Sequence, residues 1–149
     1  MLLELLATLC TGLFAGAAIY VNVVEHPARL ECGTAAALRQ WRPSYRRATV
    51  MQASLAIGGL VAALGASLQG RGTPVLVAGL LLGAVVPFTL VIIFPTNKQL
   101  LDPALDEASP RAAALLARWN RLHAVRSAAG PGATRRARRR GSRSRDSLA

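Results

Sequence analysis

The chain has 149 residues, of which 52% are hydrophobic and 17% charged, so it is long enough for one domain and too apolar for an intrinsically disordered protein. Its net charge of +11 is divided unevenly, which weakens it as a sign of nucleic-acid binding. Residues 1–126 carry 11 Lys and Arg against 6 Asp and Glu, a net charge of +5, whereas residues 127–149 carry 7 Arg against one Asp, a net charge of +6. The apolar residues of the body lie in blocks, which favours a membrane protein.

The first apolar block, residues 2–24, predicts a transmembrane helix. It contains one charged residue, Glu4, and at about 1.5 Å per residue it is long enough to cross a hydrocarbon core of about 30 Å. The alternative is a cleaved signal peptide, because Ala15-Gly16-Ala17 resembles a small-residue cleavage site. No basic residue precedes the apolar run, which favours a retained helix.

Two further apolar blocks, residues 48–68 and 74–94, predict the second and third transmembrane helices. Small residues in the second block would let helices approach closely in lipid, although an ordinary glycine-rich span has the same composition. These small residues are Gly58, Gly59, Gly65 and Ala66. The third block begins at Pro74, which suits a first helical turn, and contains Pro87, which predicts a kink.

The charges of the connecting segments predict the orientation of the helices. Five Arg residues lie in the first loop, residues 25–47, whereas the second loop, residues 69–73, has only Arg71. By the positive-inside rule, the first loop and everything after the third helix face the cytoplasm, and the N-terminus lies outside a plasma (inner) membrane. Residues 111–126 are rich in Ala and Leu and predict a helix on the cytoplasmic side.

Helices of alternating direction bring polar residues from distant segments to one cytoplasmic face. The candidate binding residues at this face are Asn22, Glu25, Tyr45, Gln52, Thr96, Asn97, Trp119, Asn120 and Arg126, and the candidate catalytic residues are His26 and His123. Asn22 and His26 are four residues apart, and so are Trp119 and His123, which places each pair on one helical face. Both imidazoles are therefore expected to approach one pocket.

Less specific interpretations apply to the same residues. Tyr45 and Trp119 are also typical of the aromatic belt at a membrane interface, and Arg126 is typical of a side chain that meets lipid headgroups. His26 lies beside a proline and is also explained as a helix-end residue that hydrogen-bonds to a carbonyl.

A metal centre is not expected. A site built from His26, His123 and Glu25 would lack a motif with ligand spacing, and Cys10 and Cys32 form neither a CxxC pair nor a metal-ligand spacing. The sequence also contains no nucleotide-binding loop, serine-hydrolase elbow or HExxH helix.

Four segments taken together resemble the anthrone-oxygenase-like integral membrane family. They are GLFAGAAIYVNVVEHPARL (residues 12–30), Tyr45 with Met51-Gln52, VVPFTLVIIFPTN (residues 85–97) and RWNRLHAVR (residues 118–126). The resemblance covers about residues 1–126 and implies an all-α bundle of four transmembrane helices. In most members of the family this domain has no assigned function.

Some fungal and bacterial members of that family oxidise an anthrone to an anthraquinone with molecular oxygen and no evident metal or flavin. The resemblance thus implies an oxygenase without a cofactor, acting on an anthrone-like aromatic polyketide. His26 or His123 would take the ring proton, and Trp119 would stack on the flat substrate. The groups that would stabilise the oxyanion are Asn22, Asn97, Asn120 and Arg126. The alternative is a non-catalytic membrane scaffold or small-molecule binding protein.

The sequence departs from the family after Arg126, where a fourth apolar helix is expected and an Arg-rich, disordered tail follows instead. We therefore expect an all-α membrane bundle with three transmembrane helices, of the four-helix type with its last helix missing or frameshifted. A frameshift is favoured because alternative frames of a GC-rich gene encode Arg, Ala, Gly, Pro and Ser. The alternative is a selected tail that binds anionic cytoplasmic lipid, and specific nucleic-acid binding is not expected.

Overall fold

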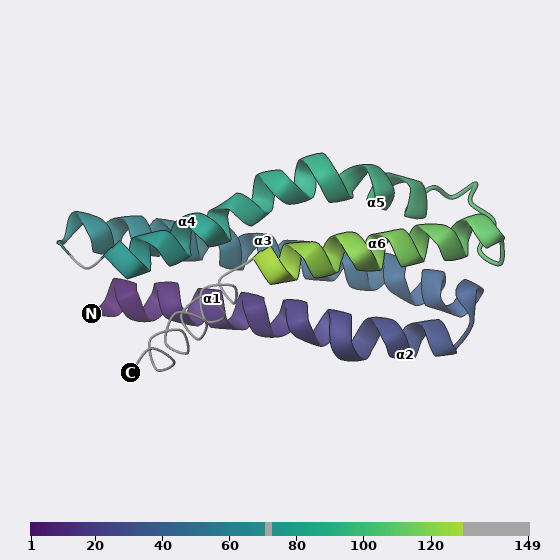
Figure 1. Ribbon diagram of the computed structural model, residues 1–149, viewed down its shortest axis with the longest axis horizontal. Coiled ribbons are helices and arrows are strands. Elements are labelled where there is room, and N and C mark those ends of the chain that lie inside the picture. Colours follow the sequence, from purple (N-terminus) through teal and green to yellow (C-terminus); the bar gives the residue numbers. More distant parts are fainter. Residues whose placement is uncertain (71–72, 130–149) are drawn as a thin grey trace, which may run out of the picture.

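The computed structural model describes residues 1–70 and 73–129, and this part of the chain is helical, without a strand (Figure 1). Its elements in chain order are α1 (Leu2–Tyr20), the π-helix η1 (Val21–Glu25), α2 (His26–Glu31), α3 (Thr34–Leu68), α4 (Thr73–Phe88), the π-helix η2 (Thr89–Ile93), α5 (Phe94–Leu100) and α6 (Pro110–Ala129). The elements α1, η1 and α2 follow one another without a break, as do α4, η2 and α5, so the bundle has four helical segments. The expected all-α class is confirmed. Most of the predicted Arg-rich tail, residues 130–149, lies outside the described residues.

Three of the four segments are long and apolar enough to cross a membrane. They are Leu2–Glu31, Thr34–Leu68 and Thr73–Leu100, and each contains one of the predicted apolar blocks. Large apolar side chains on their outer faces are exposed, among them Leu13, Val61 and Val91, which suits lipid contact better than water. These three helices are those expected of an integral membrane protein. Helix α6 is not one of the three membrane-spanning candidates.

The prediction that residues 25–47 form a loop is wrong. The first helical segment continues to Glu31 and α3 begins at Thr34, so only Cys32 and Gly33 connect them. Gly33 adopts φ 85°, a conformation that favours glycine at a helix end. Arg and Ala are good helix formers, so the helices continue through the Arg residues beyond the apolar blocks. Because α3 has 35 residues and is about 50 Å long, it extends well beyond a hydrocarbon core of about 30 Å.

Two prolines explain the two π-helical turns. The backbone N–H of His26, just before Pro27, donates to the carbonyl of Val21, five residues back, and that of Phe94, before Pro95, donates to Thr89. A proline ring clashes with the carbonyl four residues earlier, and a widened turn relieves that clash. Pro87, for which a kink was predicted, lies in the last turn of α4, directly before η2.

Small residues bring α3 and α4 into close contact in the half of the bundle that contains only the three apolar segments (Figure 1). A Cβ built on Gly79 would lie 2.2 Å from the Cβ of Ala63, and a Cβ on Gly59 would lie 2.5 Å from Leu82. Gly65, also predicted as a contact residue, packs against Leu3, whereas Gly58 is exposed. Close packing of this kind replaces the hydrophobic driving force inside lipid.

We predict that Gly79→Ala destabilises the bundle by about 1–3 kcal/mol, because the added methyl group overlaps Ala63. Thermal unfolding in detergent micelles measures the effect, and adding Ala63→Gly should restore most of the lost stability. Gly12→Ala is the matched control, since nothing lies within 4 Å of a Cβ at that position. Equal unfolding temperatures for Gly79→Ala and the wild type would contradict the predicted close contact.

Candidate functional site

A cavity of about 140 Å³ lies where α6 packs beside the other helices. One face of α3 supplies much of its wall, with lining residues at helical spacing from Trp41 to Ala56. Both π-helical turns border it, Val21 from η1 and Thr89 from η2. Most of the lining surface is apolar, and polar side chains interrupt it at intervals, as in small-molecule sites.

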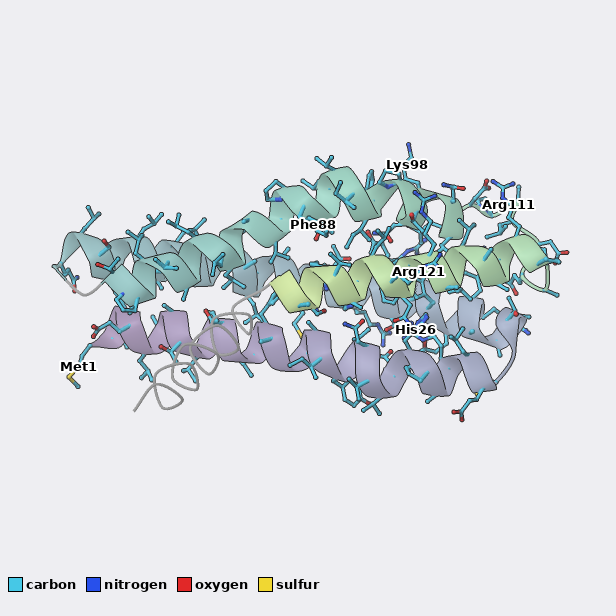
Figure 2. All side chains as sticks on the ribbon, viewed as in Figure 1. Met1, His26, Phe88, Lys98, Arg111 and Arg121 are labelled. Atoms are coloured by element: carbon cyan, nitrogen blue, oxygen red, sulfur yellow. The ribbon has the colours of Figure 1, made fainter. Side chains whose placement is uncertain are left out.

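The structure divides the sequence-predicted site residues into two groups. Those that line the cavity are Tyr45, Gln52, Asn97, Trp119, His123 and Arg126. Those that lie near it without lining it are Asn22, Glu25, His26, Thr96 and Asn120. Figure 2 shows nitrogen and oxygen atoms concentrated around α2, α5 and α6, whereas the side chains on α1 and α4 are largely carbon. The polar groups therefore gather toward one end of the bundle.

Hydrogen bonds at both ring nitrogens hold His123. Its Nδ1 lies 2.7 Å from Oδ1 of Asn22, and Nδ2 of Asn22 donates to the hydroxyl of Ser127 at 2.8 Å. The Nε2 atom is contacted by Nη2 of Arg126, and because a guanidinium only donates, Nε2 accepts. The proton of the neutral ring therefore lies on Nδ1 and is donated to Asn22, which leaves the Nε2 lone pair as the basic position.

Arg126 is a buried cation with 7% exposure. Its Nη2 also donates to Oε1 of Gln52 on α3 at 2.9 Å, and its guanidinium carbon lies 5.6 Å from the ring centroid of Phe14. Among the described residues, no carboxylate lies within salt-bridge distance of it. A buried charge without a counterion is costly, and in membrane proteins such a charge most often serves a function.

His26 is fully buried between α2 and α6 (Figure 2), and its two ring nitrogens have no hydrogen-bond partner. Its ring centroid lies 5.1 Å from that of Trp119, which in turn lies 4.7 Å from His123. The indole therefore contacts both imidazoles, and only His123 lines the cavity.

Arg29 lines the cavity and was not predicted from the sequence. Its Nη2 donates to Oε1 of Glu25 and lies 3.5 Å from the hydroxyl of Ser44. The same carboxylate oxygen accepts from Ser44 at 2.9 Å and from Gln40 at 3.1 Å. Glu25, expected to bind substrate, is thus engaged by Arg29, and the i, i+4 spacing of the two residues was the signal that could have shown it.

Trp41 is a second lining residue that the sequence interpretation missed. Its ring stacks on Tyr45 with centroids 4.9 Å apart and planes 6° apart, and it meets Trp119 edge-on at 5.6 Å. Offset and edge-to-face arrangements are the favoured geometries of aromatic pairs. These three rings give the cavity a flat, polarizable wall.

The electrostatics of α6 keep His123 uncharged. Burial, together with the neighbouring guanidinium of Arg126, holds the pKa of His123 well below its usual value. The imidazole is therefore neutral at physiological pH and has a lone pair with which it can accept a proton.

Within residues 1–70 and 73–129, no group of three His, Cys, Asp or Glu side chains is placed to hold a metal ion. His26, His123 and Glu25 do not form such a group, and the carboxylate of Glu25 is engaged by Arg29.

A loop clamp positions α6. Arg42 donates to the carbonyls of Leu100 at 3.1 Å and Asp102 at 3.0 Å, and its Nη1 lies 2.7 Å from Oε1 of Glu107. Arg39 adds a second ion pair to the same carboxylate, at 3.3 Å. These contacts fix the connection between α5 and α6, and hence the position of the helix that carries Trp119, His123 and Arg126.

The fold defines a helical membrane protein with a cavity beside α6, and comparison with known proteins shows its family. The family model described as anthrone oxygenase matches residues 41–134, and the chain belongs to this family. An anthrone oxygenase of Aspergillus fumigatus is 34% identical over 131 residues, which cover 78% of this chain and 80% of that protein. An anthrone oxygenase of Claviceps purpurea is 30% identical over 135 residues, covering 80% and 77%. No solved structure matches the chain.

We predict that Arg42→Gln loosens the connection between α5 and α6, because three contacts are lost at once. Backbone amides of residues 101–112 should exchange with deuterium about tenfold faster, while those in the apolar half of α3 keep their rates. Arg46→Gln, at an exposed position on the same helix, is the control. Unchanged exchange in residues 101–112 would show that Arg42 does not hold the connection.

Proposed function

We propose that this chain is a membrane-embedded oxygenase that uses molecular oxygen to oxidise an anthrone-like aromatic ring carbon. The observation that carries the proposal is the placement of His123, held between Asn22 and Arg126 on the wall of an apolar, aromatic-lined cavity. The names of the two relatives support the reaction class.

The proposed reaction begins with proton transfer. Nε2 of His123 takes a proton from the methylene carbon of the ring, and the unpaired amide of Asn97 stabilises the oxyanion that forms at the ring oxygen. When an acidic oxygen of the substrate accepts hydrogen bonds from Arg126, the contact between Arg126 and Nε2 is released, which frees the base.

The oxidation steps follow from the electron-rich anion. It gives one electron to oxygen, and the carbon radical and superoxide then join by a C–O bond. After protonation, the hydroperoxide breaks its O–O bond and loses water. One oxygen atom remains as the new carbonyl, the other leaves as water, and the methylene carbon is oxidised by four electrons in all.

Trp119 gives His26 a different role from that of His123. The indole contacts both imidazoles, and His26 does not line the cavity, so His26 is not in position to reach a substrate there. In this proposal His26 positions Trp119, which stacks on the substrate, and His123 is the base.

We also propose that the polar end of the bundle faces the cytoplasm and the N-terminus lies outside a plasma membrane. The exposed Arg46, Arg47, Arg118 and Arg121 support this orientation, since they belong to that end of the bundle. Membrane lipid is then the principal partner, and an Arg-rich tail would lie against the anionic leaflet.

A second candidate function is non-catalytic binding of a small molecule. It is favoured by the hydrogen bond from Arg126 to Nε2 of His123, because this contact occupies the lone pair that a catalytic base needs. A binding protein would hold an anthrone without speeding its oxidation.

We predict that purified protein accelerates quinone formation from an anthrone under oxygen, followed by absorbance. His123→Ala should lower the rate at least about 100-fold, because general bases typically contribute 10²–10⁴-fold. His26→Ala should cost less than tenfold, and Cys32→Ser, at an exposed position, is the control. A wild-type rate equal to that of spontaneous oxidation would refute the oxygenase proposal. A larger loss of rate in His26→Ala than in His123→Ala would assign the role of base to His26 instead.

We predict that the turnover number stays level from pH 8 down to pH 5. A histidine with a lowered pKa remains neutral as pH falls through 6.5, where an ordinary histidine would become protonated and lose its basic lone pair. Arg126→Gln removes a nearby positive charge, so the acid-side loss of activity should move toward neutral pH. A wild-type profile that falls with a midpoint near pH 6.5 would contradict the buried, neutral state of His123.

A further inference from the structure

Two buried guanidinium groups line the cavity at different levels along α3. Arg29 contacts Ser44, and Arg126 donates to Gln52. These two α3 residues are eight positions apart, which corresponds to about 12 Å along the helix axis. Three linearly fused aromatic rings with an oxygen substituent at each end are of comparable length.

The cavity wall is rich in hydrogen-bond donors that lack acceptors. Nε of Arg29, Nε1 of Trp41 and Nε of Arg126 are buried without a partner, although all three residues line the cavity. Asn97 supplies a further unpaired donor, together with the unpaired acceptor of its amide. Buried donors without acceptors are costly, so this wall suits a ligand that brings several acceptor oxygens.

The space between the two guanidinium groups suits a flat ring system. The stacked pair of Trp41 and Tyr45 lies on α3 at the level of Ser44, hence at the Arg29 end of this space, and Trp119 meets Trp41 edge-on. Ala48, Ala53 and Ala56 present small side chains to the same cavity, which leaves room along α3. Aromatic stacking thus accounts for the part of a ligand nearest Arg29, the small side chains leave room for the rest, and the guanidinium groups account for its two ends.

We propose that the cavity binds a linear polycyclic aromatic with an acidic oxygen group at each end, one held by Arg126 and the other by Arg29. This inference rests on the proposed function for the aromatic class of the ligand, and it goes beyond that function by assigning Arg29 as a specificity-determining residue. Arg126 supplies a cation that no carboxylate of the described chain neutralises, whereas Arg29 shares its charge with Glu25. The group held by Arg126 should therefore be the more strongly bound.

Equilibrium binding of quinones to the full chain in detergent micelles tests the proposal without turnover. The probes are anthraquinone-2,6-dicarboxylate, anthraquinone-2-carboxylate and unsubstituted anthraquinone, and the signal is quenching of tryptophan fluorescence, since Trp41 and Trp119 both line the cavity. Each carboxylate should improve the dissociation constant about tenfold, corresponding to 1.4 kcal/mol per contact. Equal dissociation constants for the three probes in the wild type would overturn the proposal, whatever the variants do.

Two variants test which Arg side chain binds each end of the ligand. Arg126→Gln should remove the stronger contact, and the double variant Glu25→Gln, Arg29→Gln should remove the weaker one without leaving a carboxylate buried and unpaired. In each case the dicarboxylate should bind no more than about twofold better than the monocarboxylate, whereas Arg46→Gln keeps the full ranking. If the double variant also binds the dicarboxylate about tenfold better than the monocarboxylate, the proposed role of Arg29 in binding the second acidic group is refuted.

The outcome separates this inference from the oxygenase proposal. A wild-type protein that ranks the three quinones as expected but forms no quinone from an anthrone retains the two-ended site and loses the enzymatic function. A protein that turns over an anthrone but binds the three quinones equally retains the function and loses the two-ended site.

Discussion

The candidate site depends on the buried guanidinium of Arg126. It joins α6 to α3 through Gln52, fixes the tautomer of His123 through Nε2, and lies against Phe14 of α1. A cation in this position is tolerated only if dipoles and ring faces replace its lost hydration. The same arrangement leaves it without a carboxylate partner among the described residues, so a ligand oxyanion can stabilise it further than the resting protein does. The site is therefore organised to respond to negative charge.

The bundle divides into two halves with different packing. Toward the turn between α3 and α4, glycine and alanine residues let the helices come into contact. The contact between Gly79 and Ala63 leaves no space for a ligand. Toward α6, the core contains large aromatic side chains, and the small side chains of Ala48, Ala53 and Ala56 on α3 leave the cavity beside them. The π-helical turns before Pro27 and Pro95 fall at this level and widen the helices there. The cavity thus follows from a change in side-chain size along the bundle.

The sequence predicts the membrane helices well because long apolar runs have few other stable structures. It places Gln52, His123 and Arg126 at one end of the bundle, since alternating helix direction and positive charge determine which ends meet. The prediction from sequence fails where a cluster of Arg residues is interpreted as the end of a helix. With residues 25–47 interpreted as a loop, the i, i+4 pairs that join Glu25 to Arg29 and Trp41 to Tyr45 were not recognised.

The rotation of α6 is the part of the site that local patterns do not determine. Trp119, His123 and Arg126 share one helical face at any rotation, but only tertiary packing decides which of them meets the cavity and which meets His26. That rotation is set by the clamp of Arg42 on the preceding loop and by Leu116 in the core. Such contacts join residues about 60 positions apart in the chain, beyond the reach of helical periodicity.

The position of the cavity at the end of the apolar blocks suits the two proposed reactants. Oxygen and a flat aromatic both favour hydrocarbon over water, so the bilayer raises their local concentration. Acidic ring substituents favour the interface, where the proposed orientation would place the Arg side chains of α2 and α6. A ligand with an apolar middle and charged ends would therefore be held at the depth where the aromatic rings and guanidinium groups occur together. The bilayer and the cavity would then both favour ligands with an apolar middle and charged ends. Among such ligands, the protein would discriminate by the distance between the two charges.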